Sequence, residues 1–108
     1  MKSNDFNDMY ELRIDKSRKV LVVKGKEYSG KDDRLHNFKR VAEFARVTPE
    51  QACLVLMGKH LISIVDAVVD EAEITQEWID EKVGGSFNYH PLLEGLFTER
   101  MERQNEHS

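Results

Sequence analysis

The sequence has a single cysteine, no signal-peptide pattern and no long apolar run. Its single cysteine, Cys53, excludes an internal disulfide and suits a reducing compartment. The first eight residues lack the apolar region of a signal peptide, and no apolar run approaches the ~20 residues that span a bilayer. We therefore expect a cytoplasmic protein without a membrane-spanning segment.

Several ligand-binding signatures are also missing. Gly25 and Gly30 lack the spacing and the following Lys-Ser/Thr of a Walker A loop. No zinc-finger, helix-turn-helix or RNA-binding signature is present, and the one cysteine and four scattered histidines show no zinc-ligand spacing. Zinc and nucleic acid are therefore not expected partners.

The net charge of −4 hides an uneven distribution. Residues 16–46 carry ten Lys/Arg and four Asp/Glu, whereas residues 47–108 carry four and twelve, so the two segments have charges of +6 and −8. One interpretation is that basic and acidic faces dock on each other or on a second copy. The other is a basic loop that meets phosphates beside an acidic patch that holds a cation.

Helical periodicity predicts the first two elements. Apolar residues at helical spacing predict a helix over residues 5–26, which we favour over a short strand at Val20–Val23. A second helix is predicted over residues 35–46. Its buried residues are expected to be Leu35, Phe38, Val41, Ala42 and Ala45.

The third helix has the clearest start. Thr48-Pro-Glu-Gln51 is a capping box with proline at the first helical position. From there to about Asp70 the chain is apolar nearly all round, which predicts a central position in the fold. The expected core stripe of this helix is Leu54, Met57, Leu61, Ile64 and Val68.

Thr75 is expected to cap a fourth helix that is interrupted further on. A glycine costs a helix about 1 kcal/mol relative to alanine and a proline about 3 kcal/mol, so Gly84-Gly85 and Pro91 predict a break between them, with His90 capping a new segment. The predicted fold class is all-α: a single domain over residues 1–108, built as a bundle of four to five helices. Its last long helix would be broken near Gly84–Pro91, and residues from about 103 to 108 would be frayed.

The segment from Gly25 to Phe38 is too rich in functional groups for a simple connection. It holds two glycines, three carboxylates, three cations, one histidine and one asparagine within fourteen residues. Connections between helices are usually about two to eight residues long, and loops of varied polarity often display binding sites. We therefore expect this loop to form one wall of a site.

The predicted central helix carries polar groups in apolar surroundings. Lys59, Ser63 and Asp66 are spaced four and three apart, so they would share one face. They could form a bridged network or a solvated face. Alternatively, Lys59 would meet a phosphate and Asp66 would help to hold a divalent cation.

A set of short motifs resembles a known family. Lys26-Glu-Tyr-Ser-Gly30, Asn37-Phe38, Lys59-His60 and Asn88-Tyr89 before Leu92-Leu93 are similar to segments of small phage and prophage proteins of the nucleotide-modification-associated group. That group is in turn similar to the all-α MazG-type nucleoside triphosphate pyrophosphohydrolases. The similarity spans roughly residues 20–100.

The resemblance implies an all-α, often dimeric protein that binds a nucleotide with Mg²⁺ or cleaves it between the α and β phosphates. Together with the interpretation of the central helix, the resemblance predicts that Glu27 and Asp66 are the catalytic and metal-binding carboxylates. The predicted nucleotide-binding residues are Tyr28, Lys31, Asn37, Lys59, Asn88 and Tyr89. The family pattern has an aspartate where this chain has Gly85, so the metal site of such an enzyme would be degenerate.

The expected partners are therefore a nucleotide or small phosphate ligand and further copies of the chain, as a homodimer or higher homo-oligomer. A phage-encoded protein would act in the host cytoplasm. The alternative function is a non-catalytic helical interaction module that binds a host protein, or itself, through its acidic C-terminal half.

Overall fold

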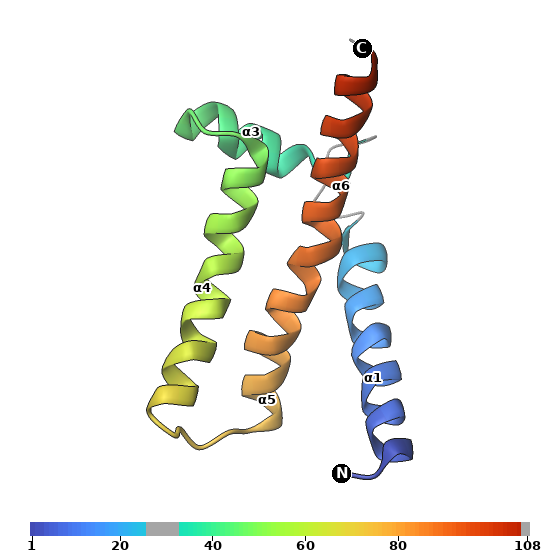
Figure 1. Cartoon of the computed structure of the whole chain (residues 1–108), viewed down its shortest axis with the longest axis vertical. Helices are drawn as coiled ribbons and strands as arrows, with labels where there is room; N and C mark the ends of the chain where they lie inside the picture. Colours follow the sequence, from blue (N-terminus) through green and yellow to red (C-terminus); the bar gives the residue numbers. More distant parts are fainter. Residues whose placement is uncertain (26–32, 107–108) are drawn as a thin grey trace.

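The computed structural model describes residues 1–25 and 33–106, and every element within them is helical (Figure 1). This confirms the all-α class. The elements are α1 (Ser3–Arg18), η1 (Lys19–Val23), α3 (His36–Ala45), α4 (Pro49–Val69), α5 (Gln76–Trp78), η2 (Ile79–Val83) and α6 (Gly84–Glu106), where η marks a π-helical turn.

The β-branched run at Val20–Val23 is helical, as favoured. It forms η1, which continues α1 with a wider turn closed by a 3.0 Å bond from the Lys24 N–H to the Lys19 carbonyl. Extending an existing helix gains a backbone bond for each residue added. A short strand has no partner strand here within the described residues, so the helix continues.

Two of the predicted helix caps, at Thr48 and Thr75, are present. The Gln51 N–H donates to the Thr48 hydroxyl at 3.1 Å, and the Thr48 N–H donates to the Gln51 side chain at 2.8 Å, which completes the capping box of α4. The Thr75 hydroxyl accepts from the Trp78 N–H at 3.1 Å and starts α5. These contacts are local, which is why sequence alone locates them.

The predicted break between Gly84 and Pro91 is wrong. Helices α5, η2 and α6 follow one another without interruption, and Pro91 lies inside α6, which extends to Glu106 (Figure 1). The irregularity is instead the π-helical turn η2, directly before Gly84. His90 therefore lies within a helix and caps none.

Tertiary contacts explain why glycines occupy positions 84 and 85 of the helix. A Cβ added at Gly84 would collide with the guanidinium of Arg13 from α1, and one added at Gly85 would lie 2.5 Å from the His60 ring of α4. The two glycines thus let side chains from two different helices approach the α6 backbone closely. Their cost in helix propensity is offset by these contacts.

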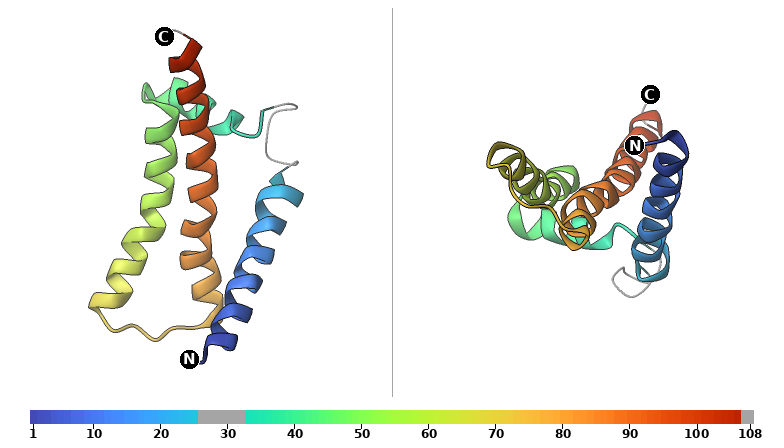
Figure 2. Two further views of the ribbon diagram at one scale, coloured as in Figure 1. Left: turned by 45° about the vertical axis from the view of Figure 1, so that its right-hand side comes forward. Right: turned by 90° about the horizontal axis from the view of Figure 1, so that it is seen from below.

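The central rod of the molecule is the α5–η2–α6 helix, not α4. Helix α4 runs antiparallel to it on one side, α1 lies on the other side, and α3 crosses one end of α4 (Figures 1 and 2). Seen from below in Figure 2, the two flanking helices diverge from α6 as an open V. The molecule is elongated, with principal extents of 49 × 30 × 29 Å.

The hydrophobic core is small and lies where α3, α4 and α6 meet. Leu35, Phe38, Cys53 and Leu96 form its buried centre, with Cys53 fully inaccessible. Burial raises the pKa of the Cys53 thiol, which lies 4.0 Å from the Tyr89 carbonyl oxygen. Cys53 is therefore a core residue rather than a nucleophile.

Several residues predicted to be buried are exposed. Val41 and Ala45 face solvent on α3, and of the predicted α4 stripe only Met57 is buried; Leu54, Leu61 and Val68 are exposed. Because α4 packs against η2 and α6 along one side and against α3 near its start, a helix that is apolar nearly all round leaves its outward side uncovered. The prediction that α4 is central is wrong for this reason.

Helix α1 is held to the rod by a charged cluster around Asp80. The Asp80 carboxylate accepts from Arg13 at 2.7 Å, from Lys16 at 3.0 and 3.1 Å, and from Gln76 at 3.1 Å. These bonds, led by that of Arg13, lower the pKa of Asp80 to about 2. The charged form of Asp80 therefore favours the docked position of α1.

Replacing Asp80 with Asn should loosen α1 in a pH-dependent way. An unfolded aspartate has a pKa of about 3.9, so the stabilisation by Asp80 is complete above about pH 4 and is lost as the pH falls toward 2. Thermal unfolding monitored by Trp78 fluorescence should give a lower melting temperature for Asp80→Asn at pH 7, and the gap to wild type should close toward pH 2. Asp8→Asn on exposed α1 is the control. A gap that stays constant with pH would contradict the assignment.

Replacing Pro91 with Ala should stabilise the protein. Pro91 has no N–H to donate to the Phe87 carbonyl one turn earlier, and proline in a helix interior costs up to about 3 kcal/mol. The free energy of unfolding from urea denaturation should therefore rise. A fall would mean that α6 is shaped around a bend at Pro91.

Candidate functional site

A cavity of about 340 Å³ lies where η1, the chain before α3, α4 and α6 come together. Small-molecule sites usually enclose about 300–1,000 Å³ and combine apolar walls with a few polar groups. The residues that line the cavity are Val20, Leu21, Arg34, Asn37, Phe38, Leu56, His60, Gly85, Asn88, Tyr89 and Leu92.

Two buried polar atoms of this lining lack partners. The Nδ1 atom of His60 and the Oδ1 atom of Asn88 have no hydrogen-bond partner among the residues that the structure describes. Buried polar atoms are nearly always paired, and an unpaired one costs about 1–3 kcal/mol. A polar ligand in the cavity would supply the missing partners.

The position of His60 depends on Gly85 and Tyr89. The glycine leaves room for the imidazole against the α6 backbone, and the His60 and Tyr89 rings lie 5.6 Å apart at an angle of 42°. Burial raises the pKa of the Tyr89 hydroxyl, and the nearby Cys53 adds to the shift. Two aromatic rings from facing helices thus form one side of the cavity.

The cavity lining carries one full positive charge. Arg34 donates from its Nε atom to the Leu21 carbonyl at 3.2 Å, which ties the chain before α3 to η1. Of the described residues that line the cavity, none other than Arg34 has a carboxylate, guanidinium or ammonium group. The electrostatics therefore suit an anionic ligand, and a guanidinium is well shaped to bind phosphate.

The structure brings together three of the predicted nucleotide-binding residues. Asn37, Asn88 and Tyr89 all line this cavity, although they come from α3 and α6. The sequence interpretation missed Arg34 and His60. A signal existed for His60, which is a polar residue in an apolar helix, but only the fold pairs it with Gly85.

Other predicted residues do not join them. Lys59 is exposed, and Asp66 lies in a separate shallow hollow of about 270 Å³ with Asp70 and Lys82. Each residue of an α-helix is turned by about 100° from the one before, so Lys59 and Asp66 leave α4 in directions different from that of His60. They do not line the cavity with Asn37, Asn88 and Tyr89, and because residues 26–32 of the loop lie outside the described residues, their role as its opposite wall stays a prediction.

The remaining predicted residues, Glu27, Tyr28 and Lys31, lie outside the described residues. Of the acids at the end of that loop, Asp33 is engaged by Lys39 at 2.6 Å, and this bond lowers the pKa of Asp33. Lys39 also binds Glu99 of α6 at 3.0 Å. Asp33 therefore fastens the start of α3 to α6 rather than lining the cavity.

The residues that the structure describes do not assemble the predicted magnesium site. Within residues 1–25 and 33–106, no three His, Cys, Asp or Glu side chains are grouped closely enough to hold a metal ion. Asp66, one of the two predicted ligands, lies away from the cavity.

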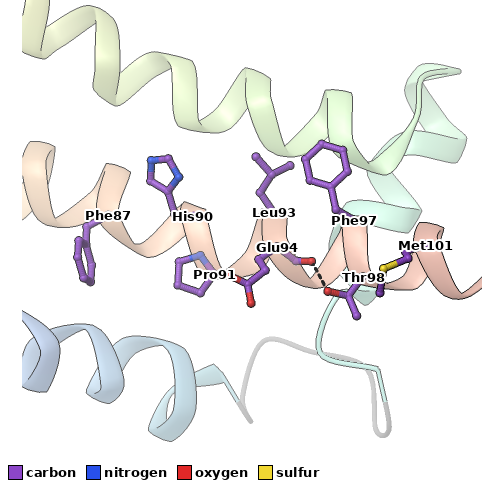
Figure 3. A pocket seen from close by; sticks show the side chains of 8 residues that line it. All are labelled: Phe87, His90, Pro91, Leu93, Glu94, Phe97, Thr98 and Met101. Carbon is purple, nitrogen blue, oxygen red and sulfur yellow. Dashed lines mark hydrogen bonds between the residues drawn. The ribbon is translucent and has the colours of Figure 1, made fainter.

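A further hollow of the surface has a different character. Its volume is about 590 Å³, and its eight lining residues all belong to α6 (Figure 3). In Figure 3, His90, Leu93 and Phe97 point toward α4, whereas Phe87 and Pro91 point the opposite way. Thr98 donates to the Glu94 carbonyl of its own helix at 2.8 Å. The hollow is an open groove along one helix and brings no polar groups together from different elements.

Replacing Gly85 with Ala should lower the melting temperature, even though alanine is favoured over glycine in a helix by about 1 kcal/mol. The added Cβ would meet the His60 ring and displace it. In a double-mutant cycle, His60→Ala should remove this penalty, so that Gly85→Ala becomes stabilising in that background. Equal effects of Gly85→Ala in both backgrounds would contradict the contact.

The chain matches no family model, no curated protein and no solved structure to which it was compared. The assignment of the cavity as the candidate site rests on its own geometry: two unpartnered buried polar atoms, two aromatic rings and one guanidinium.

Proposed function

We propose that the protein binds a nucleotide in the cavity between η1, α3, α4 and α6. The observation that carries the proposal is the pair of buried, unpartnered atoms His60 Nδ1 and Asn88 Oδ1 among the residues that line it. A nucleobase offers hydrogen-bond donors and acceptors along one edge. It therefore suits two polar atoms set in apolar walls.

The base would be recognised by an amide and by aromatic rings. An asparagine side chain can pair with a base edge through two hydrogen bonds, as it does with adenine in nucleic acids. His60 and Tyr89 offer ring faces, and the stacking of a base on an aromatic side chain contributes about 1–3 kcal/mol. A planar heterocycle thus matches both the polar and the apolar parts of the lining.

The phosphate would meet Arg34. Arg34 belongs to the lining, and its Nε atom is bonded to the Leu21 carbonyl of η1. A cavity of about 340 Å³ is near the lower end of the range for ligand sites, so a nucleoside with one enclosed phosphate is favoured. Further phosphates would extend into solvent.

The geometry supports binding more than hydrolysis. Cleavage of a phosphoanhydride would need carboxylates that hold a metal ion near the phosphates. Among the residues that the structure describes, no carboxylate belongs to the lining of the cavity. We therefore propose a nucleotide-binding protein, in agreement with the ligand class, though not the catalysis, implied by the resemblance to MazG-type enzymes.

The test is a thermal-shift and calorimetry panel of nucleoside mono- and triphosphates, with nucleosides and inorganic phosphate included, each with and without Mg²⁺. At least one nucleotide should raise the melting temperature of the protein, whereas inorganic phosphate should not. A panel without any shift or heat of binding would overturn the proposal.

Replacing Asn88 with Leu should separate stability from binding. Leucine has a similar shape and removes the unpaired oxygen, so the ligand-free protein should gain about 1–3 kcal/mol. This corresponds to several degrees in melting temperature. The same variant should lose the nucleotide-induced shift.

Asn7→Leu on the exposed part of α1 is the matched control, because it makes the same chemical change away from the cavity and should keep the shift. An Asn88→Leu variant that binds as well as wild type would contradict the role of Asn88.

A further inference from the structure

The outward side of α4 carries a regular apolar seam. Its residues are spaced alternately four and three apart, which is the pattern of helices that pack together along their length. We define the outer seam as Leu54, Gly58, Leu61, Val65 and Val68. Its four side chains are 43–73% exposed, and the adjoining Val55, Ile62 and Val69 are 63–73% exposed.

No contact among the described residues explains Gly58. The other four described glycines, Gly25, Gly84, Gly85 and Gly95, each lie so close to a side chain that a Cβ would collide or be crowded. At Gly58, in the middle of α4, an added Cβ would meet nothing within 4 Å. A glycine there lowers helix stability without an internal benefit, and it would allow another helix to approach closely.

The exposed area of the chain exceeds that of a self-contained monomer. The accessible surface is 8410 Å², whereas a compact monomer of 12.6 kDa exposes about 6,200 Å². The radius of gyration is 16.3 Å, against about 13 Å for a compact domain of this length. The surplus is larger than the roughly 800 Å² that each partner contributes to a standard interface.

We propose that a second copy of the chain covers the outer seam, with the two α4 helices antiparallel and crossing at Gly58. Such an interface is symmetric, so each copy offers the same apolar patch. Gly58 lies close to the midpoint of Pro49–Val69, and an antiparallel crossing there overlaps the two helices over their full length.

The charges at the two ends of α4 favour this direction. Exposed Arg46 lies in the turn before α4, beside the Arg40–Glu43 ion pair of α3, whereas exposed Asp70, Glu71 and Glu73 follow the other end of α4. In an antiparallel pair the basic end of one copy lies beside the acidic end of the other. A parallel pair would bring like charges together at both ends.

A bilayer is a poorer occupant than a second copy. Among the described helices α4 alone is long and apolar enough to cross a membrane by length and composition. Lys59 and Asp66 interrupt it, however, and it packs along η2, which carries Asp80, Glu81 and Lys82. Crossing a bilayer would bring these charges toward hydrocarbon at a large cost.

The interface leaves the cavity accessible. His60 lies about 200° around α4 from Gly58, so the proposed interface and the nucleotide site occupy opposite sides of the helix. The inference is therefore independent of the proposed function, and either can fail alone.

Sedimentation equilibrium of the full chain over micromolar to millimolar concentrations tests the dimer. Wild type should approach twice the mass of 12.6 kDa. Val65→Glu should raise the dissociation constant on the order of 100-fold or more, because the charge enters the symmetric interface twice.

Val22→Glu is the matched control, since Val22 is also 58% exposed but lies on η1, and this variant should remain dimeric. A monomeric wild type, equal weakening by both variants, or binding of monomers to phosphatidylcholine–phosphatidylserine vesicles would overturn the proposal.

Gly58→Ala tests the close approach of the two α4 helices, because it should stabilise the monomer and weaken the dimer. The methyl group should raise the helicity and melting temperature of the dilute monomer, because it enters open space and improves helix propensity. It should also weaken association about 10-fold or more by separating the helices. Association that is unchanged or stronger would overturn the crossing at Gly58.

Cysteine cross-linking tests the direction. In the antiparallel arrangement, Leu54 faces Ile62 of the second copy, so a mixture of Leu54→Cys and Ile62→Cys should form a heterodimeric disulfide. Leu54→Cys alone should not cross-link, because eight residues of helix separate the two thiols by about 12 Å. The native Cys53 is fully buried and does not compete. Rapid cross-linking of Leu54→Cys alone would overturn the antiparallel arrangement.

Discussion

The close approach of two helices to the backbone of α6 at Gly84 and Gly85 organises this structure. Arg13 of α1 lies over Gly84 and binds Asp80, one turn earlier on the same rod, while His60 of α4 lies against Gly85. A side chain at Gly85 would displace the His60 ring, and one at Gly84 would move the Arg13 guanidinium. The α6 backbone is therefore the common surface on which α1 and α4 are placed, and the helix must remain continuous to serve both.

This arrangement produces an open molecule in which the cavity and the exposed apolar surface have a common origin. The buried core is confined to the junction of α3, α4 and α6 around Phe38 and Cys53. Away from it, α1 and α4 diverge, and α4 is covered on its α6 side alone. One side of α4 thus supplies His60 to a small polar cavity, and its other side presents valines and leucines that one chain leaves uncovered.

The candidate site shows which of its residues short sequence motifs can predict. Asn37, Asn88 and Tyr89 were predicted from short motifs and do line one cavity. Lys59 and Asp66 were chosen by composition and spacing on the correct helix, but the rotation of α4 directs them elsewhere. That rotation is set by which face meets α6, a long-range choice that an almost uniformly apolar helix does not reveal.

The sequence by itself determined the all-α class, the capping box at Thr48, the helix start at Thr75, and the helical state of the region before Gly25, because these depend on hydrogen bonds and periodicity within a few residues. Only the tertiary structure decided that Gly84, Gly85 and Pro91 lie in an unbroken helix and that α4 is a flank rather than the centre. The physical reason is that contacts between distant segments can offset a local propensity of a few kcal/mol. Those contacts arise between residues far apart in the chain, such as His60 with Gly85 and Arg13 with Asp80.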